Sequence, residues 1–224
     1  IVKGEQLYAC ARQWDKLCRN TEVRGMHACK HAIDMVRQCD IILLAVKPAQ
    51  MSEAISTVKE HLQGKAVVSI AAGMFFETYE QLLPPHTQHL SVIPNMPVSV
   101  CEGVMLWEQR NSLQTEEAVA VEQLFSAIAF IEKLESDQMT IGATVAGCGP
   151  AFAAMFIEAL GDGAVAYGLG REAAYRLCAQ MMAGTAKQLL VHPQHPGQLK
   201  DRVSSPKGTT IQGVAELERL GFRN

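Results

Sequence analysis

The densest run of polar side chains in the sequence is Val203–Ile211, which contains four hydroxyl side chains and Gly208. It leads into a helix expected over Thr209–Leu220. The first N–H groups of a helix have no partner within the helix, so together with hydroxyl groups they can bind a small carboxylate or phosphate. The alternative is an ordinary helix cap formed by Thr209 or Thr210. A cap needs one hydroxyl group rather than four, so the segment favours an anion site.

Three apolar runs end in small residues or prolines, at Ala45–Pro48, Ala71–Gly73 and Pro94–Pro97. If these runs are parallel strands, their carboxyl ends meet at one edge of the sheet, where doubly wound sheets bind their ligands. Glycine and alanine there let a flat ligand approach the backbone. Each of these ends alone could simply mark the change from strand to loop, but three in succession predict a ligand crevice.

The strand expected at Leu7–Cys10 is followed by Arg12 and Lys16, with no acidic residue at the strand end. A site for NAD usually has Asp or Glu at this point to bind the ribose hydroxyls. Without a carboxylate, a 2′-phosphate is not repelled, and Arg12 can pair with it bidentately. The pattern favours NADP, although a solvated arginine at the start of a helix explains it equally well.

The glycine-rich loop G-x-G-x-x-G that binds dinucleotide phosphates is missing from the sequence. In this fold the loop precedes the first helix, and Ile1–Gly4 is interpreted as the end of that helix. We therefore expect the start of the domain to be truncated. No nucleophile–base pair stands out either, because Cys148 has no histidine nearby in the sequence and is expected to be a small buried residue.

The first half of the chain alternates strands and helices. Such an alternation is needed if the three strand ends described above are to lie at one edge of a parallel sheet. Strands are expected at Leu7–Cys10, Ile41–Val46, Ala66–Ile70, Leu90–Ile93, Val104–Trp107 and Phe130–Leu134. Helices are expected at Asp15–Arg24, Ala32–Cys39, Met51–Leu62, Phe75–Leu83 and Thr115–Ala127. The run Ile41–Val46 is apolar throughout, as in a strand buried on both faces. This alternation predicts an α/β Rossmann domain with a doubly wound, mainly parallel sheet over residues 1–135.

From residue 136 onward no strand is expected, so residues 136–224 are predicted to form an all-α domain. Long helices are expected at Asp137–Tyr167 and Arg171–Val191, and a turn at Arg202–Pro206. The first of these helices is apolar on nearly all faces and should be buried on most sides, with a bend at Gly147–Pro150. Three helices offer little to cover it. We therefore favour an oligomer over a self-contained bundle.

Composition excludes several classes of protein. Lys and Arg total 20 against 23 Asp and Glu, a formal net charge of −3, so the chain lacks the basic excess of a nucleic-acid-binding protein. Uninterrupted apolar runs such as Ile41–Val46 are too short to cross a membrane, so no membrane association is expected. The seven cysteines form no C-x-x-C pair, and the histidine pairs 27/31, 86/89 and 192/195 are interpreted as surface residues, so no metal site is expected. Free thiols indicate a reducing, cytoplasmic location.

The polar cluster also belongs to a longer recognisable motif. The segment His195–Ile211 closely resembles the signature of the pyrroline-5-carboxylate reductases, and Gly147–Phe152 is similar to that family's Gly-Ser-Gly-Pro-Ala-Tyr turn. The strand ends at Ala45–Pro48, Ala71–Gly73 and Pro94–Pro97 match its cofactor-side motifs. The similarity runs the whole length of the chain in the right order, and the combination is highly specific.

The resemblance implies an enzyme that reduces 1-pyrroline-5-carboxylate to L-proline with NADPH or NADH, the last step of proline biosynthesis. It implies a Rossmann domain and a helical domain that forms a homodimer, and some members of the family build larger rings of dimers. By resemblance, the cofactor is bound by Arg12, Ala45, Val46, Lys47, Pro48, Ala71, Ala72 and Gly73. The substrate carboxylate and ring nitrogen are bound by Val203, Ser205, Gly208, Thr209 and Thr210. Thr210 is the candidate catalytic hydroxyl at the ring nitrogen.

The chain departs from the family pattern at a few positions. These are Ala32, Ser91, Met96, Cys148, Phe152 and Lys207. The family also continues some dozens of residues beyond Arg223, so the end is expected to be truncated as well. Two alternatives stay open: a non-catalytic paralogue that keeps the dimer fold, and another NADP-dependent reductase of the β-hydroxyacid dehydrogenase type. The second requires a catalytic lysine, and Lys187 lacks the usual neighbouring asparagine.

Overall fold

The computed structural model describes residues 2–224, and the chain divides into two compact units, Ile1–Ala151 and Phe152–Asn224. The expected helix end at Ile1–Gly4 therefore begins outside the described residues, and Gly4–Gln6 forms a short 3₁₀ turn. The sequence-based domain boundary at residue 136 stays a prediction.

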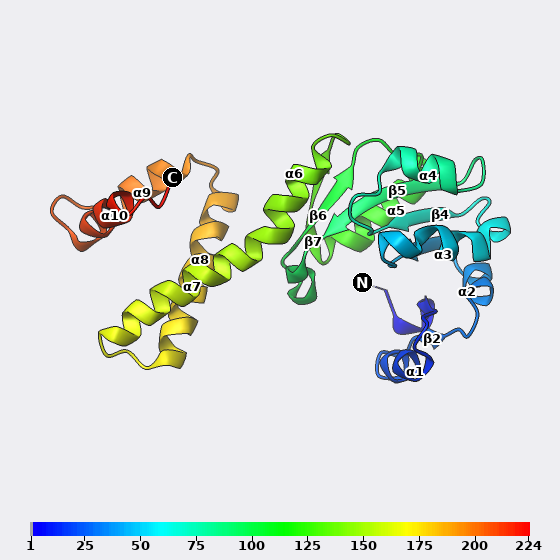
Figure 1. Cartoon of the computed structure of the whole chain (residues 1–224), viewed down its shortest axis with the longest axis horizontal. Coiled ribbons are helices and arrows are strands. Elements are labelled where there is room, and N and C mark those ends of the chain that lie inside the picture. Colours follow the sequence, from blue (N-terminus) through cyan, green and yellow to red (C-terminus); the bar gives the residue numbers. More distant parts are fainter. Residues whose placement is uncertain (1) are drawn as a thin grey trace. The chain divides into compact units, whose positions relative to one another are not determined.

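The first unit is an α/β unit (Figure 1). Its strands are β1 (Tyr8–Ala9), β2 (His27–Ala28), β3 (Ile41–Leu44), β4 (Ala66–Ser69), β5 (Gln88–Pro94), β6 (Gly103–Glu108) and β7 (Ala129–Leu134). Its helices are α1 (Trp14–Glu22), α2 (Ala32–Gln38), α3 (Met51–Val58), α4 (Phe76–Leu82), α5 (Thr115–Ser126) and α6 (Met139–Ala143). Every strand and helix predicted for this half is present, with ends shifted by a few residues. β2, only two residues long, was not predicted.

The strands form two sheets. Strands β3 to β7 pair in chain order, and only the β5–β6 pair is antiparallel. Strands β1 and β2 form a separate parallel pair. The predicted α/β fold with a mainly parallel sheet is thus confirmed, and the strand order within the larger sheet runs in one direction.

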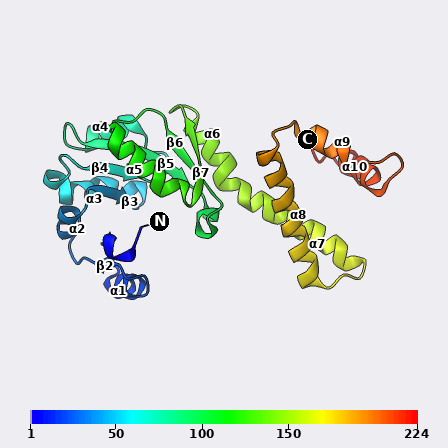
Figure 2. The same ribbon diagram turned by 180° about the vertical axis from the view of Figure 1, so that it is seen from behind.

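Helices cover the larger sheet on both faces, as Figures 1 and 2 show from opposite sides. Strand β4 illustrates the packing, because consecutive side chains of a strand point to opposite faces. Val67 packs into a core with α2, α3 and α4, whereas Val68 packs into a second core with α5. All four residues of β4 are buried, so this strand is covered on both faces, as the sequence analysis expected of the neighbouring strand.

The same expectation is wrong for the neighbouring strand β3. Ile42 and Leu44 are buried, but Leu43 between them is 48% exposed. Alternation puts Leu43 on the opposite face from its neighbours, and within the described residues that face of β3 is not fully covered. An apolar run therefore identified the strand but not the number of covered faces.

The second half is helical, as predicted. Its helices are α7 (Gly149–Ala166), α8 (Arg171–Val191), α9 (Pro196–Arg202) and α10 (Thr209–Arg219). Helix α9 was not predicted, and it ends where a turn was expected to begin. The predicted bend before α7 takes the form of a π-helical turn, Thr144–Cys148, that joins α6 to α7. The side chain of Asn95 donates to the carbonyl of Ala146 in this turn, at 3.0 Å.

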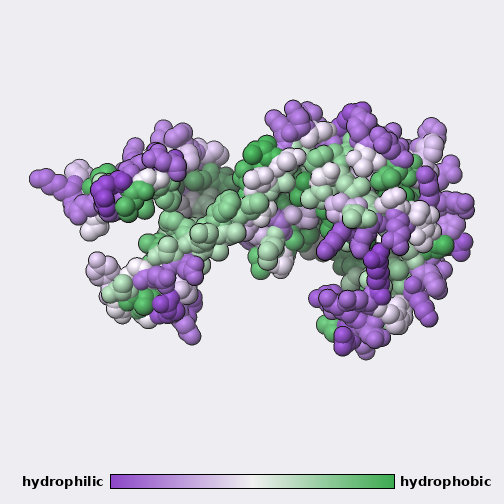
Figure 3. Space-filling view, viewed as in Figure 1, coloured by the Kyte–Doolittle hydropathy of each residue, from purple (hydrophilic) through white to green (hydrophobic). Residues whose placement is uncertain are grey.

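The continuous helix Met139–Ala166 exposes apolar side chains. An 18-residue stretch within it has a mean hydropathy of 1.6 and contains no buried residue, and by length and composition alone the helix could cross a membrane. The expectation from uninterrupted apolar runs therefore missed this segment, because small and polar residues interrupt its apolar side chains. Figure 3 shows hydrophobic residues along this helix. Large exposed side chains on it include Ile141, Val145, Phe152, Met155 and Leu160.

Two further expectations about single residues are wrong. Cys148 is exposed rather than buried, because it lies on this uncovered helix. His89 is 2% exposed rather than a surface residue, since it belongs to β5, and its Nε2 lies 2.7 Å from Oε1 of Glu80. All seven cysteines are free.

Candidate cofactor and substrate sites

The carboxyl ends of β3, β4 and β5 lie at one edge of the larger sheet, because the three strands are parallel neighbours. Just beyond the β3–β4 pairing, the N–H of Ile70 donates to the carbonyl of Leu44 at 3.1 Å. The predicted cofactor segments Ala45–Pro48 and Ala71–Gly73 follow directly after these ends. The structure thus brings two of the predicted segments together.

A buried hydroxyl pair fixes the segment after β4. Ser69 Oγ lies 2.5 Å from Tyr79 Oη and accepts a hydrogen bond from the N–H of Ala71 at 3.2 Å. Burial raises the pKa of Tyr79, so its hydroxyl group stays protonated near neutral pH. Gly73 has φ +78°, and no atom lies within 4 Å of the position a Cβ would take. The backbone is therefore open to a flat ligand at this point.

The segment after β3 turns sharply into α3. Lys47 is extended, and its carbonyl accepts from the N–H of Gln50 at 2.8 Å in a short 3₁₀ turn that begins at Pro48. The lysine and proline side chains are both exposed. Helix α3 follows and is held to the core by Met51, which is fully buried. A cation on a rigid turn at this edge suits a ligand that carries phosphates.

Arg12, at the end of β1, pairs with an acidic residue of α3. Its Nη2 donates to Glu53 Oε2 at 2.9 Å, and the two side chains are 67% and 74% exposed. The contact links the end of β1 to the helix that follows the β3 segment, although 41 residues separate the partners. The sequence predicted an arginine without a carboxylate at this strand end. The structure instead supplies a carboxylate from α3.

Two thiols lie near each other at the ends of β1 and β2. Cys10 and Cys29 follow the paired strands β1 and β2, and the N–H of Cys29 donates to the carbonyl of Ala9 at 2.8 Å. Partial burial, with smaller contributions from nearby negative groups such as Asp34, raises the pKa of both thiols. Near neutral pH they are neutral, so they add no negative charge beside a bound phosphate.

The predicted substrate residues form the loop between α9 and α10. The N-cap of α10 is Gly208, and no side chain caps this helix. The alternative that Thr209 or Thr210 serves as the N-cap is therefore wrong. Both threonines are exposed in the first turn of α10, beside N–H groups that have no partner within the helix.

Glycine at position 208 has a steric cause. A Cβ there would lie 2.3 Å from Ser205 Oγ and 3.1 Å from the Ser205 carbonyl, which accepts from the N–H of Gly208 at 3.0 Å. Lys207 before it has φ +61°, in the left-handed region that favours glycine. The tight turn brings the hydroxyl of Ser205 against the start of α10. Val203, also predicted to contact the substrate, is 60% exposed before the turn.

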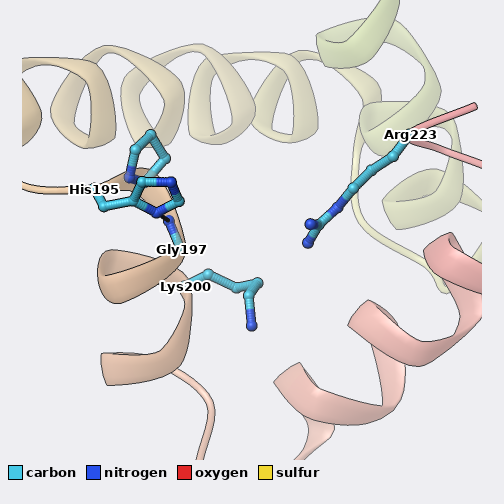
Figure 4. A pocket seen from close by; sticks show the side chains of 5 residues that line it. His195, Gly197, Lys200 and Arg223 are labelled. Carbon is cyan, nitrogen blue, oxygen red and sulfur yellow. Dashed lines mark hydrogen bonds between the residues drawn. The ribbon is translucent and has the colours of Figure 1, made fainter.

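A cavity of about 340 Å³ lies at the start of α9 (Figure 4). It is lined by His195, Pro196, Gly197, Lys200 and Arg223. His195 Nδ1 accepts from the N–H of Gly197 at 3.1 Å, which caps α9. None of the predicted substrate residues lines this cavity. Within residues 2–224, no group of three or more His, Cys, Asp or Glu side chains is placed to hold a metal ion.

The predicted site residues fall into two sets, one in each unit. The cofactor set gathers at the ends of β1, β3 and β4 in the first unit, and the substrate set lies around the start of α10 in the second. Glu53 is the residue that the sequence analysis missed. No local pattern signals it, because only the fold brings it to Arg12.

Family models match both parts of the chain. The model described as NADP oxidoreductase, coenzyme F420-dependent, matches residues 1–73. The model described as pyrroline-5-carboxylate reductase dimerisation matches residues 136–224. Together with the Rossmann-like sheet, these matches define an NADP-dependent oxidoreductase with a helical dimerisation domain.

Individual relatives agree with these matches. A pyrroline-5-carboxylate reductase of Treponema pallidum is 42% identical over 226 residues, which cover 99% of this chain and 86% of that protein. One of Methanosarcina acetivorans is 40% identical over 190 residues, 84% of this chain and 70% of that protein. The crystal structure of Plasmodium falciparum pyrroline carboxylate reductase with NADP bound matches with a TM-score of 0.86 at 28% identity, covering 100% of this chain and 82% of that one. The chain belongs to the pyrroline-5-carboxylate reductase family.

Proposed function

We propose that this chain reduces 1-pyrroline-5-carboxylate to L-proline with NADPH, as the last step of proline biosynthesis. The observation that carries the proposal is the turn before α10, where Ser205, Thr209 and Thr210 present hydroxyl groups beside unpaired N–H groups of the helix. This arrangement suits a small ligand that combines a carboxylate with a ring nitrogen. The relatives named for this reaction at 40–42% identity support the same reading.

On the cofactor side, the residues at the sheet edge fit a dinucleotide. The open backbone at Gly73 accepts a flat group, and Arg12 has free donors for a phosphate. NADPH, when bound, supplies the hydride that the imine carbon accepts. The role of the strand ends is to hold this cofactor in a fixed orientation. Ala45, Val46, Lys47, Pro48, Ala71 and Ala72 complete the proposed set.

On the substrate side, the α10 turn holds and orients the imine. The N–H groups and hydroxyls at the start of α10 complement the carboxylate, because the positive end of the helix dipole points toward it. We assign Thr210 to the ring nitrogen, where its hydroxyl group donates a hydrogen bond. Holding the ring in one orientation lowers the barrier by removing the entropy of encounter.

The proposal is tested by following oxidation of NADPH by the full-length protein in the presence of pyrroline-5-carboxylate and by identifying the product as L-proline. Turnover with this imine supports the proposal. Absence of turnover by a folded, dimeric protein would favour the non-catalytic paralogue. Turnover only of 3-hydroxy acids would favour the β-hydroxyacid dehydrogenase alternative.

We further propose that the helical unit forms a homodimer. The dimerisation model covers residues 136–224, and within this region α7 buries only Gly161 while α8 buries only Ala174 and Cys178. A second copy would cover these apolar faces and would also account for the apolar length of Met139–Ala166 without a membrane. Assembly of dimers into a larger ring stays a prediction.

A cytoplasmic location is part of the proposal. All seven cysteines are free, and partial burial raises the pKa of Cys10, Cys29 and Cys39, so that these thiols stay protonated near neutral pH. Unpaired thiols in this number are typical of a reducing compartment. Fractionation of cells that produce the protein would test the location directly.

A further inference from the structure

We infer that Glu53 is a specificity-determining residue that lets this enzyme use NADH as well as NADPH. The inference rests on the proposed function, since it concerns the cofactor edge of the same enzyme. It starts from the contact between Glu53 of α3 and Arg12, which follows β1; their charged atoms lie 2.9 Å apart.

The place of Glu53 in the fold is fixed by the helix that carries it. Met51, Ile55 and Val58 of α3 are buried in the core, so Glu53 lies on the opposite, exposed face. Helix α3 begins just after the Pro48–Gln50 turn, at the same edge as the predicted cofactor residues. The carboxylate is therefore held at this edge by a packed helix.

The chemistry of an adenosine ribose explains why this position matters. In dinucleotide sites for NAD, a carboxylate at the strand end that corresponds to the end of β1 accepts hydrogen bonds from the ribose hydroxyls, whereas sites for NADP use an arginine for the 2′-phosphate. Here one edge holds both groups. The bond to Arg12 uses Oε2 of Glu53, which leaves Oε1 for a ribose hydroxyl. It also uses one of the five N–H donors of the guanidinium group, which leaves four for a phosphate.

The two cofactors should respond to Glu53 in opposite directions. With NADH, the carboxylate accepts from the ribose and Arg12 balances its charge. With NADPH, the same carboxylate lies close to the 2′-phosphate and repels it, and it also competes for Arg12. The ion pair is exposed and therefore weak. A phosphate can therefore bind Arg12 alongside Glu53, or in its place, at a small cost in free energy. Glu53 thus reduces the preference for NADPH without abolishing NADPH binding.

Glu53 has an alternative, purely structural role. It lies in the first turn of α3, where an acidic side chain stabilises the helix dipole. That role predicts a change in thermal stability on substitution but no change in the choice between cofactors. The ratio of the two cofactors' kinetic constants therefore separates the two roles.

The test compares wild type with Glu53→Gln, which keeps the size of the side chain and removes its charge. We expect the ratio of kcat/KM for NADPH to that for NADH to rise about tenfold, which corresponds to about 1.4 kcal/mol. The ratio should rise because kcat/KM increases with NADPH and decreases with NADH. Glu53→Asp, which restores the charge, should bring the ratio back toward wild type.

The matched control is Glu60→Gln, because Glu60 is an exposed acid on the short turn that follows α3, Lys59–His61. It should leave the ratio unchanged. A second readout uses calorimetric binding of 2′,5′-ADP and of AMP, which report on the adenosine end without catalysis. The Glu53→Gln variant should bind 2′,5′-ADP more tightly than wild type does, whereas its affinity for AMP should not increase.

The outcomes separate this inference from the proposed function. If wild type turns over pyrroline-5-carboxylate but Glu53→Gln changes neither the kinetic ratio nor the two binding constants, the inference is overturned while the function stands. Equal losses for both cofactors would also overturn it, because they indicate a general structural role. If wild type shows no turnover, the function fails, and the binding of 2′,5′-ADP and AMP still decides the role of Glu53.

Discussion

The two ends of this chain bury their apolar residues to very different extents. In the sheet of the first unit, Leu90 and Val92 are at most 1% exposed, and helices cover both faces. In the helical region, Met155 is 67% exposed and Leu190 is 76% exposed. Both regions are rich in apolar side chains. Only the first has the layers needed to cover them within one chain.

This difference shows that hydrophobic composition does not by itself define a core. A sheet between two layers of helices is a complete structure, whereas long helices with apolar residues on most faces need a further partner. The sheet region is expected to keep its structure in a single chain. The helical region is expected to gain most of its stability from a second copy.

The largest effect is expected for Met155→Glu in α7. A buried charge at the centre of an interface costs about 2 kcal/mol or more per site, and a two-fold dimer contains the site twice. We therefore expect dimer affinity to fall by about a thousandfold, since about 4 kcal/mol corresponds to that factor. Analytical ultracentrifugation over a concentration series measures this directly.

The control for that prediction is Val23→Glu, which changes an equally apolar side chain, 84% exposed, in the first unit. It should leave the dimer intact. A Met155→Glu protein that remains fully dimeric would break the comparison between the two regions. So would a wild-type protein that sediments with lipid vesicles, because α7 would then be covered by lipid.

The next effect concerns two leucines in contrasting surroundings. Leu90→Ala removes a side chain from the closed core of the sheet, and such changes cost about 2–5 kcal/mol. Trp107 lies in the same core and reports unfolding by its fluorescence. Leu190→Ala removes an equal side chain from α8, where it should leave this transition unchanged and alter only the dimer affinity. Equal losses of core stability in both variants would contradict the comparison.

A smaller effect is expected in the turn before α10. Thr210→Val keeps the shape of the side chain and removes its hydroxyl group, so it should lower kcat/KM for the imine by about 10- to 150-fold. NADPH affinity should stay unchanged, because the cofactor residues lie in the other unit. No side chain caps α10, so the melting temperature should not fall either. Normal kinetics in a folded variant would refute the role of Thr210.

The smallest effect is expected at Lys207. Its φ of +61° costs a residue with a side chain about 1 kcal/mol, which glycine avoids. Part of this gain is offset by the greater freedom of glycine in the unfolded chain. Lys207→Gly should therefore raise stability by less than about 1 kcal/mol, whereas Lys200→Gly in the middle of α9 should lower it by about that amount. Changes of the same sign in both variants would show that the strain at Lys207 is absent.

The sequence predicted the elements with strong periodicity or long apolar runs. It placed β4 well because β4 is a compact apolar run, and α8 because this is a long stretch of helix-forming residues without proline. It missed β2, since two residues carry no period, and α9, since seven residues that include a proline and a glycine show little helical periodicity. It also misjudged Leu43, because the cover over a strand depends on distant elements.

For the predicted site, too, local signals were visible in the sequence and contacts between distant residues were not. The strand ends and the α10 turn were visible because each is a contiguous motif in the sequence. The ion pair between Arg12 and Glu53 was not, because its partners are 41 residues apart and both are ordinary charged residues. Local patterns therefore located the edge of the sheet but not the full set of charges gathered there.

The π-helical turn at Thr144–Cys148 acts as a phase-setting element of the long helix. Its wider winding sets every later side chain back by about one residue's rotation, some 100°, relative to an uninterrupted α-helix. It also holds the carbonyl of Ala146 as an acceptor for Asn95. Deleting one residue from this turn would restore the regular ladder and keep the apolar stripe that carries Met155 in place, because the turn accommodates one extra residue. Straightening the turn with all its residues kept would instead rotate the stripe, and would thus change which face of α7 is available for a partner while leaving the sheet unchanged.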